Sequence, residues 1–329
     1  MGLQLTTNQT NQYQKHFAKR FLNTLKDTLV MDQFATKEPL PAGNGADTVR
    51  FFVEPNGDMN DVIALAEGTV ENTTFSDNNL VETDVQLDYF GDKQKISNRL
   101  SLTSFFDRIK SSQRKMGLSA ALKFDYLMTA ALVTVQATAG HKRYAGGAAN
   151  FAALQALSAA NGAWTPILGL ANSTQLKNDK VAKAQGEDFI HVIPPNISFD
   201  LMQHSKWENP ALYSGAKQIM KGEIGRLYGA RYVEHTNPWI EDGAAGAENT
   251  YAAAGNIYGV LTLGDEALGA VDLASPGVSP YKPSMTILDK ADKSDPHNQF
   301  IITAWAAYFK AVALSQKRYV VTRCKTTFV

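Results

Sequence analysis

The chain of 329 residues is predicted to be an α+β protein, because the spacing of its hydrophobic residues changes along its length. Hydrophobic residues recur every three or four positions within residues 17–29 and again within 101–139, which indicates amphipathic helices. Within residues 48–96 they alternate with polar residues, which indicates strands with one face in solvent. Hydrophobic residues make up 44% of the chain, enough for one large core or two ordinary ones.

Residues 1–45 are predicted to form an N-terminal arm. A polar leader is followed by a basic amphipathic helix with Phe17 and Phe21 on its apolar side, and Pro39 and Pro41 end this segment. A basic arm of this kind most often docks on a neighbouring surface. The cations that we expect to make this contact are Lys15, Lys19, Arg20 and Lys26.

Residues 46–100 are predicted to form an extended hairpin. The alternating run from Val81 to Tyr89 matches a shorter run from Val49 to Val53, and a long polar, Asn-rich segment separates the two. An isolated two-stranded hairpin is only marginally stable in water, so we expect this one to lie on another surface.

The hairpin and the segment that follows it carry opposite charges, although the whole chain has no net charge. Residues 54–88 contain nine carboxylates and no Lys or Arg, whereas residues 93–123 contain eight Lys or Arg and one acid. A like-charge segment is either solvated or faces an oppositely charged partner, and we expect that partner to be a second copy of the chain. The candidate contact residues are Glu67, Glu71, Glu82, Asp84 and Asp88 of the hairpin and Arg108, Lys110, Arg114 and Lys115 of the next segment.

Residues 101–140 are predicted to form a long spine helix, with a buried stripe that includes Met116, Leu122 and Val133. At 1.5 Å per residue this segment could extend for roughly 55 Å. Gly117 is the expected place for a bend or a break.

The pattern after residue 140 is mixed. Strands are predicted at residues 189–193, 230–234, 260–263 and 285–288. Residues 300–327 remain open between helix, which their alanines favour, and strand, which their aromatic and β-branched residues favour.

The sequence contains no recognisable catalytic, metal or cofactor pattern. The six histidines lack the i, i+4 pairing of a helical zinc site, and the lone Cys324 excludes a cysteine zinc site. The chain has neither a G-x-S-x-G elbow nor a G-x-x-x-x-G-K-[ST] phosphate loop, and no stretch approaches the roughly 20 apolar residues that span a bilayer. We therefore expect a non-enzymatic protein with no cofactor, no metal and no membrane partner. A hydrolase with an unrecognised site is the alternative from another class.

Four segments in the second half of the chain carry motifs whose order is informative. They are His191–Pro195, the stretch GEIGRLYGARYVEHTN at residues 222–237, Val260–Gly269, and the block from Asp295 through Trp305 to Lys310. Each motif is loose by itself. Together, and in this order, they resemble the core segments of the major capsid proteins of tailed double-stranded DNA bacteriophages.

The resemblance implies the Hong Kong 97-type capsid fold, which consists of an N-terminal arm, an extended E-loop hairpin, a peripheral domain with a long spine helix, and a mixed axial domain. It favours strand for the last segment. The implied divisions are residues 1–45 for the arm, 46–100 for the E-loop hairpin, 101–140 for the spine helix, 141–285 for the axial domain and 286–329 for C-terminal strands of the peripheral domain.

The resemblance also implies a structural protein of the virion, made in the bacterial host cytoplasm, that self-assembles into pentamers and hexamers of an icosahedral head. The implied partners are other copies of the chain, a separate scaffolding protein, a portal, packaged DNA through non-specific contacts, and a decoration protein as an open alternative. Some relatives cross-link through an E-loop lysine, but residues 54–92 contain no lysine, so no cross-link is expected there. An encapsulin-type compartment with enzyme cargo is the alternative within the same fold.

Overall fold

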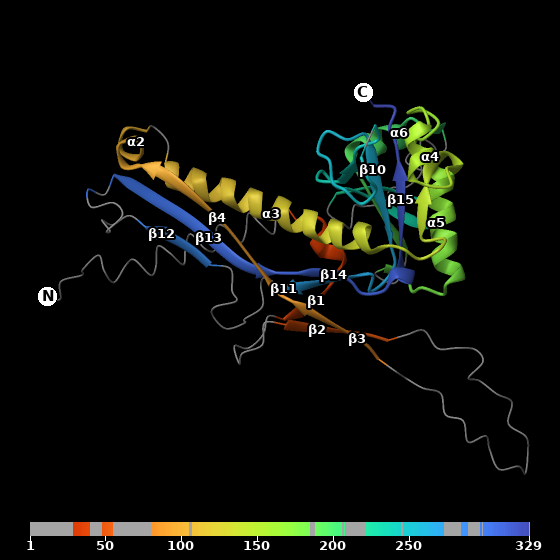
Figure 1. Cartoon of the computed structure of the whole chain (residues 1–329), viewed down its shortest axis with the longest axis horizontal. Coiled ribbons are helices and arrows are strands. Elements are labelled where there is room, and N and C mark those ends of the chain that lie inside the picture. Colours follow the sequence, from red (N-terminus) through yellow and green to blue (C-terminus); the bar gives the residue numbers. More distant parts are fainter. Residues whose placement is uncertain are drawn as a thin grey trace, which may run out of the picture.

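The computed structural model of the chain describes residues 29–39, 48–54, 80–104, 107–184, 188–205, 207, 222–244, 246–272, 284–288, 297 and 299–328. The molecule is elongated, and the long helix α3 (Arg108–Val135) runs from one end towards a globular end (Figure 1). The largest sheet forms this globular end, and two smaller sheets lie along the helix.

The predicted spine consists of two helices, α2 (Asn98–Thr103) and α3, and the break between them precedes Arg108. Asp107 is the N-cap of α3, and its carboxylate accepts a hydrogen bond from the backbone N–H of Lys110. The prediction of a bend or break at Gly117 is wrong, because this residue lies buried within the continuous helix. One interior glycine costs about 1 kcal/mol of helix stability, which tertiary packing along the rest of a long helix outweighs.

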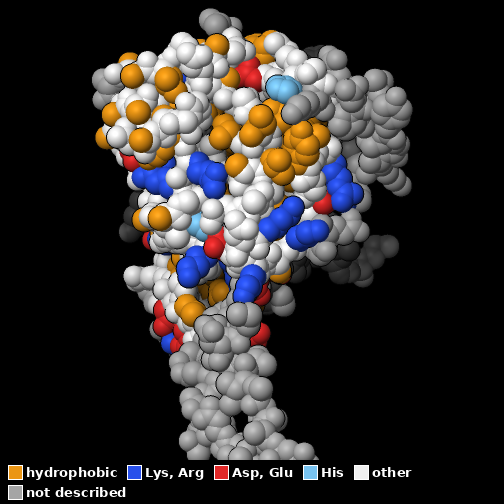
Figure 2. Space-filling view, turned by 90° about the vertical axis from the view of Figure 1, so that its right-hand side faces the viewer, with side chains coloured by type: hydrophobic (Ala, Val, Ile, Leu, Met, Phe, Trp, Pro, Cys, Tyr) orange, Lys and Arg blue, Asp and Glu red, His pale blue; other side chains and the backbone are white. Residues whose placement is uncertain are grey.

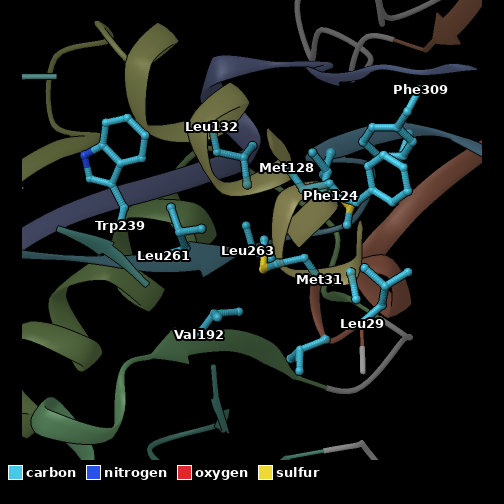
Figure 3. Packing of buried hydrophobic residues seen from close by; sticks show 14 of the residues in the cluster. Leu29, Met31, Phe124, Met128, Leu132, Val192, Trp239, Leu261, Leu263 and Phe309 are labelled. Carbon is cyan, nitrogen blue, oxygen red and sulfur yellow. The ribbon is translucent and has the colours of Figure 1, made fainter. Parts of the chain in front are cut away.

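The buried face of α3 contributes to the largest hydrophobic core. Phe124, Met128 and Leu132 expose none of their surface. In Figure 3 these side chains lie among residues that include Leu263 of the largest sheet and Met31 from the N-terminal side of the chain. One helix face thereby joins segments that are far apart in the sequence.

The predicted stripe on the spine helix is partly correct. Met116 and Val133 are buried as predicted, whereas Leu122 is 46% exposed. The fully buried positions 116, 120, 124, 128 and 132 recur every four residues. Leu122 lies two residues from this series, which places it on the opposite face of the helix.

Two three-stranded sheets pack along α3. The first contains β12 (Ser284–Leu288), β13 (Phe300–Phe309) and β4 (Asp88–Ser97), and the second contains β1 (Ala35–Pro39), β11 (Leu268–Asp272) and β14 (Ala311–Ala313). Strand β13 alternates strictly between buried and half-buried residues, and its Trp305 and Phe309 rings pack on Phe124. This alternation outweighs the alanine content of the segment, because every second residue is buried towards α3.

Strands β2 (Thr48–Val53) and β3 (Val81–Gln86) form the predicted antiparallel hairpin. Its inner side chains, including Phe51 and Val85, pack on Val271 of β11 and on Leu314. The hairpin base therefore has the supporting surface that the sequence led us to expect. Residues 55–79 between the strands lie outside the described residues.

The largest sheet has seven strands in the order β5-β15-β10-β6-β8-β7, with β9 also paired to β10. Their bounds are β5 (Lys142–Tyr144), β6 (Phe189–Ile193), β7 (Glu223–Leu227), β8 (Ala230–Glu234), β9 (Trp239–Glu241), β10 (Ile257–Leu263) and β15 (Tyr319–Cys324). The predicted strands at 189–193, 230–234, 260–263 and 285–288 are confirmed as β6, β8, β10 and β12. Strands β10 and β15 are buried at every residue, which is typical of central strands covered on both faces.

The C-terminal strands divide between two sheets. Strand β13 joins β4 and β12, whereas β15 pairs with β10 in the largest sheet. The uninterrupted apolar run in β15 suits the fully covered interior of the larger sheet. The predicted domain divisions, including residues 286–329 as peripheral strands, stay predictions.

The remaining helices are short. Figure 1 shows α4 (Phe151–Ala156) and α5 (Pro166–Asn178) along one side of the largest sheet and α6 (Pro195–Met202) near its upper end. Both α5 and α6 begin with a proline, which fits the first turn because its missing N–H would have no helical partner there. Single 3₁₀ turns occur at η2 (Met31–Phe34), η4 (Ala145–Gly147) and η6 (Gln316–Arg318).

The substitution Phe124→Ala is expected to lower the free energy of unfolding of the isolated subunit by about 3–5 kcal/mol, because it leaves a cavity among three aromatic rings. Denaturant unfolding measures this loss. Leu122→Ala on the exposed face of the same helix is the control, with an expected change of about 0.5 kcal/mol or less. Equal losses for the two variants would contradict the assignment of the buried face.

Candidate functional site

Glu82 and Asp84 lie on the exposed face of β3, and both pair with Arg50 of the same chain. The Arg50 guanidinium is 2.6 Å from an Asp84 carboxylate oxygen and 2.9 Å from a Glu82 oxygen. Arg50 stands directly opposite Asp84 in the antiparallel register, and its hydrogen bond lowers the pKa of Asp84. All three side chains are about half exposed, so these pairs are weak and are screened by salt.

The sequence already held the signal for this pairing. Val49, Phe51 and Val53 are the buried residues of β2, so Arg50 between them faces solvent. Residues that face solvent on two neighbouring antiparallel strands share one face of the hairpin. Counting charges only within residues 54–88 missed this arginine because it precedes the counted segment by four positions.

Asp88 also has a cationic partner in its own chain. It begins β4, and its carboxylate lies 2.6 Å from the ammonium group of Lys310, which directly follows β13. Three of the five candidate hairpin acids are thus paired locally. The candidates outside the described residues are Glu67 and Glu71 of the hairpin and Lys15, Lys19, Arg20 and Lys26 of the arm.

The four candidate cations of the spine lie in the first two turns of α3. Arg108 donates a hydrogen bond to the Ser104 hydroxyl at 2.9 Å, and Lys110 lies 3.0 Å from the Asp107 carboxylate. Arg114 and Lys115 are exposed, and no acid within the described ranges forms an ion pair with either. Of the four cations, Lys110 thus has an acidic partner and Arg108 a hydroxyl partner, whereas Arg114 and Lys115 have no ion-pair partner among the described residues.

Within the described residues, no ion pair joins the hairpin base to the basic first turns of α3. Strand β11 packs between the middle of α3 and the hairpin base, because its Leu268 and Ala270 lie in the core under α3 while Val271 packs under the hairpin. Figure 1 accordingly shows α3 on one side of the β1-β11-β14 sheet and the β2-β3 hairpin on the other.

A further group of cations lies on the globular end. Figure 2 shows a band of Lys and Arg side chains below exposed hydrophobic side chains on this face. On this globular end, the exposed lysines Lys177, Lys180 and Lys183 lie at the end of α5 and just after it. Sequence reasoning assigned no role to this group.

Arg323 is the largest fully buried side chain in the described parts of the chain, and it is surrounded by polar partners. Its guanidinium contacts Glu241 at 2.8 Å, Asn249 at 2.6 Å and Glu248 at 3.3 Å. Glu241 also accepts hydrogen bonds from the Trp239 indole N–H and from the backbone N–H of Asn249. This network ties the chain after β9 to the middle of the largest sheet.

Two opposing effects act on the pKa of Glu248. Burial raises its pKa, but hydrogen bonds from Lys142 and Tyr144 and the charge of Arg323 together lower it more, so the pKa is below its usual value. The resulting stabilisation is present above the unfolded-state pKa of Glu248 and is lost as the pH falls through the folded-state value. The network should therefore weaken only in acid.

The residues that come nearest to a nucleophile and a base are Ser173 of α5 and His191 of β6. The Ser173 hydroxyl oxygen is 3.5 Å from His191 Nε2, and both residues are fully buried. Burial lowers the pKa of His191 to about 3, so the ring is neutral at physiological pH. The other ring nitrogen, Nδ1, forms a hydrogen bond with the Thr262 hydroxyl of β10 at 2.8 Å. His191 thus makes buried polar contacts with both the helix α5 and the neighbouring strand of the sheet.

The part of the chain that the structure describes holds no cluster of three or more His, Cys, Asp or Glu residues that could bind a metal. Cys324 is buried, and burial raises the pKa of its thiol, which disfavours the reactive thiolate. A hollow beside Phe90 and Lys310 has a volume of about 200 Å³, smaller than the roughly 300–1,000 Å³ of ordinary ligand pockets.

By length and composition alone α3 could cross a membrane, contrary to the expectation from the sequence. Of its most apolar stretch, 44% is buried inside the molecule. Its buried face packs on the sheets around it, as in the core helices of folded domains.

Comparisons with known proteins give a clear result at the level of fold. No family model and no curated protein matches the chain. The capsid of Ralstonia phage GP4 has a TM-score of 0.64 at 12% identity and covers 89% of this chain and 87% of its own. The capsid of cyanophage P-SCSP1u has a TM-score of 0.62 at 15% identity, with 91% and 89% covered. The holo-SrpI encapsulin of Synechococcus elongatus has a TM-score of 0.52 at 10% identity, with 91% and 88% covered.

These similarities extend over most of each chain and include the arrangement of helix and sheets described above. The chain has the Hong Kong 97-type capsid fold, as its sequence motifs implied. At these identities the similarity establishes the fold, and the function must be argued from it.

The substitution Arg323→Met is expected to lower the free energy of unfolding by about 3–5 kcal/mol, because it leaves the charge of Glu241 buried without its partner. Adding Glu241→Leu should recover part of the lost free energy of unfolding, since the unpaired charge is then absent. Denaturant unfolding of the two variants measures both effects. Arg50→Met, which removes an exposed arginine, is the control. If Arg323→Met lowers the free energy of unfolding by no more than this control does, the role of the buried network is contradicted.

Proposed function

We propose that this chain is a major capsid protein, the subunit of a tailed double-stranded DNA bacteriophage head. In this proposal the chain assembles into pentamers and hexamers of a closed icosahedral shell. The observation that carries the proposal is the fold, which solved phage capsids share over most of both chains at 12% and 15% identity. A structural role also agrees with the buried setting of Ser173 and His191.

The distribution of charge supports assembly through copies of the same chain. The described base of the acidic hairpin lies on the side of the β1-β11-β14 sheet away from α3, whereas the exposed cations Arg114 and Lys115 lie near the start of α3. Complementary surfaces at different places on one chain make head-to-tail contacts, which close into rings when the rotation permits. Many such weak contacts become strong together while each one stays reversible.

The proposed contact is narrower than the full set of candidate residues. Glu82, Asp84 and Asp88 already have partners in their own chain. The acids left to face a neighbouring copy are those of the hairpin segment outside the described residues, which includes Glu67 and Glu71. We place Arg114 and Lys115 of the neighbour opposite them, because no acid among the described residues pairs with these cations.

The proposed location is the virion head shell, after synthesis in the host cytoplasm. Further partners belong to this proposal: a separate scaffolding protein, a portal, a decoration protein, and packaged DNA through non-specific contacts. The basic arm, with Lys15, Lys19, Arg20 and Lys26, is proposed to contact an adjacent subunit on the inner side of the shell. No covalent cross-link through the hairpin is proposed, since residues 54–92 contain no lysine.

An encapsulin-type compartment is the second candidate, because an encapsulin shares the fold with a TM-score of 0.52. The two candidates differ in what the shell contains. Electron microscopy with nuclease and protease treatment of purified particles distinguishes packaged DNA from packaged protein.

The chain is expected to form closed shells built from pentamers and hexamers when produced with its scaffolding protein. Analytical ultracentrifugation should show particles far heavier than the 35.9 kDa subunit, and electron microscopy should show closed heads. A protein that stays a compact monomer at high concentration with its scaffold present would contradict the proposed function.

Reversing two spine charges, Arg114→Glu with Lys115→Glu, is expected to impair shell assembly at physiological salt. Adding Glu67→Lys with Glu71→Lys should restore part of the yield, because opposite charges would again face each other. Particle yield by sedimentation measures both effects.

The matched control is Lys177→Glu with Lys183→Glu, an equal charge change on the globular end. The proposed electrostatic contact is contradicted if the variant with reversed spine charges assembles normally at low salt, or if the control variant impairs assembly equally. Either result would leave the proposal of a capsid shell standing wherever shells still form. Reversing Glu82 and Asp84 would be a poor rescue, since it would place two new cations beside Arg50.

A further inference from the structure

Two connections between the β1-β11-β14 sheet and the largest sheet lie side by side. Residues 264–267 lead from β10 to β11, and residues 314–318 lead from β14 to β15. The connections are bonded to each other, because the backbone N–H of Gly264 donates to the Arg318 carbonyl at 2.9 Å. Gly264 permits this close approach, since a Cβ at this position would lie 2.9 Å from the Arg318 carbonyl oxygen. The two connections therefore form one junction between the sheets.

The Arg318 side chain links this junction to the acidic hairpin. It is 14% exposed, and its Nη1 pairs with the Glu266 carboxylate while its Nη2 donates a hydrogen bond to the backbone carbonyl of Glu54 at 2.6 Å. Glu54 directly follows β2, and the part of the hairpin outside the described residues begins after it. A guanidinium group presents its N–H donors in a rigid, planar fork. Binding both groups at once therefore fixes the Glu54 carbonyl relative to the junction.

Glu266 has a backbone conformation that its residue type disfavours. Its φ of 47° lies in the left-handed region, which glycine adopts without the steric cost of a Cβ. Glycine or asparagine would therefore form this connection more easily than glutamate. Non-glycine residues held in such conformations cluster at positions where the strain accompanies a function. At position 266 the glutamate supplies the carboxylate that pairs with Arg318.

We propose that Arg318, held by Glu266, is a positioning residue for assembly. The contact from Glu266 through Arg318 to the Glu54 carbonyl, which we term the hairpin clamp, fixes the point and direction from which residues 55–79 continue towards a neighbouring copy. A binding segment whose exit is fixed in advance loses less conformational freedom when it binds. The use of the clamp in assembly rests on the proposed function, whereas the clamp itself is a property of the single subunit.

Hydrogen exchange of the unassembled subunit tests the clamp. In Arg318→Met we expect the protection of the peptide covering residues 48–54 to fall about fivefold or more, because a charge-assisted hydrogen bond at the end of β2 is lost. Glu266→Gly removes the carboxylate and also relieves the left-handed strain. It should lower the same protection while the free energy of unfolding, measured with denaturant, stays equal to that of the wild type or rises. An ion pair that only stabilised the fold would not separate these two measurements.

Arg226→Met is the matched control, because Arg226 of β7 makes an ion pair with Asp188 at 2.8 Å on the globular end. This variant should leave the exchange of the hairpin peptide unchanged. Arg318→Lys keeps the charge without the fork, so we expect it to keep only part of the protection. Exchange in peptides of α3 reports whether each variant is folded. If Arg318→Met does not fold, Arg318→Lys and Glu266→Gly decide.

Unchanged hairpin protection in folded Arg318→Met or Glu266→Gly would overturn the clamp, as would an equal loss in Arg226→Met. Shell yield is measured separately by sedimentation and electron microscopy, and both clamp variants should lower it while Arg226→Met should not. Loosened hairpins with normal shell yields would overturn the role in assembly. Absence of wild-type shells would refute the proposed function and with it the use of the clamp in assembly, whereas the exchange result would still establish or exclude the clamp.

Discussion

The burial of one face of α3 is the interaction on which the other layers depend. Phe124, Met128 and Leu132 are fully buried, and residues of β11, β13, η2 and the largest sheet belong to the same core. Full burial of each such side chain stabilises the fold by roughly 1.5–3 kcal/mol. A three-stranded sheet or a two-stranded hairpin gains independent stability only by packing on such a surface, so the long helix is what allows the elongated part of the molecule to exist.

Charged groups inside the molecule lie where elements are joined. Arg323 and Glu241 connect β15 with β9, and Asp125 connects α3 with Val30 and His235. A buried charge without a partner costs several kcal/mol, so each of these joints tolerates few alternative arrangements. Such pairs fix which segments meet, while the apolar contacts supply most of the stabilisation.

Charges at the surface follow another rule. Exposed acids of the hairpin base find cations on the adjacent strand, and these pairs remain weak and sensitive to salt. Local pairing of this kind leaves fewer charges for contacts with another copy. In the proposed shell the charges available for such contacts are those without an ion-pair partner among the described residues, and on α3 these include Arg114 and Lys115.

The sequence by itself predicted helix or strand where the spacing of apolar residues was clear, and it left residues 300–327 open between the two until the motifs resembling capsid proteins were considered. The predicted elements included the hairpin, α3 and the strands β6, β8, β10 and β12, and the order of loose motifs indicated a fold shared with capsids of 12% and 15% identity. Only the tertiary structure decided which apolar faces meet: it exposed Leu122, kept α3 continuous through Gly117 and placed β15 in the largest sheet. It also decided the charge pairs, since Arg323 and Glu241 are 82 residues apart and Asp125 and Val30 are 95. Local spacing fixes the orientation of side chains within one element, whereas the partner of each face depends on contacts between elements distant in the sequence.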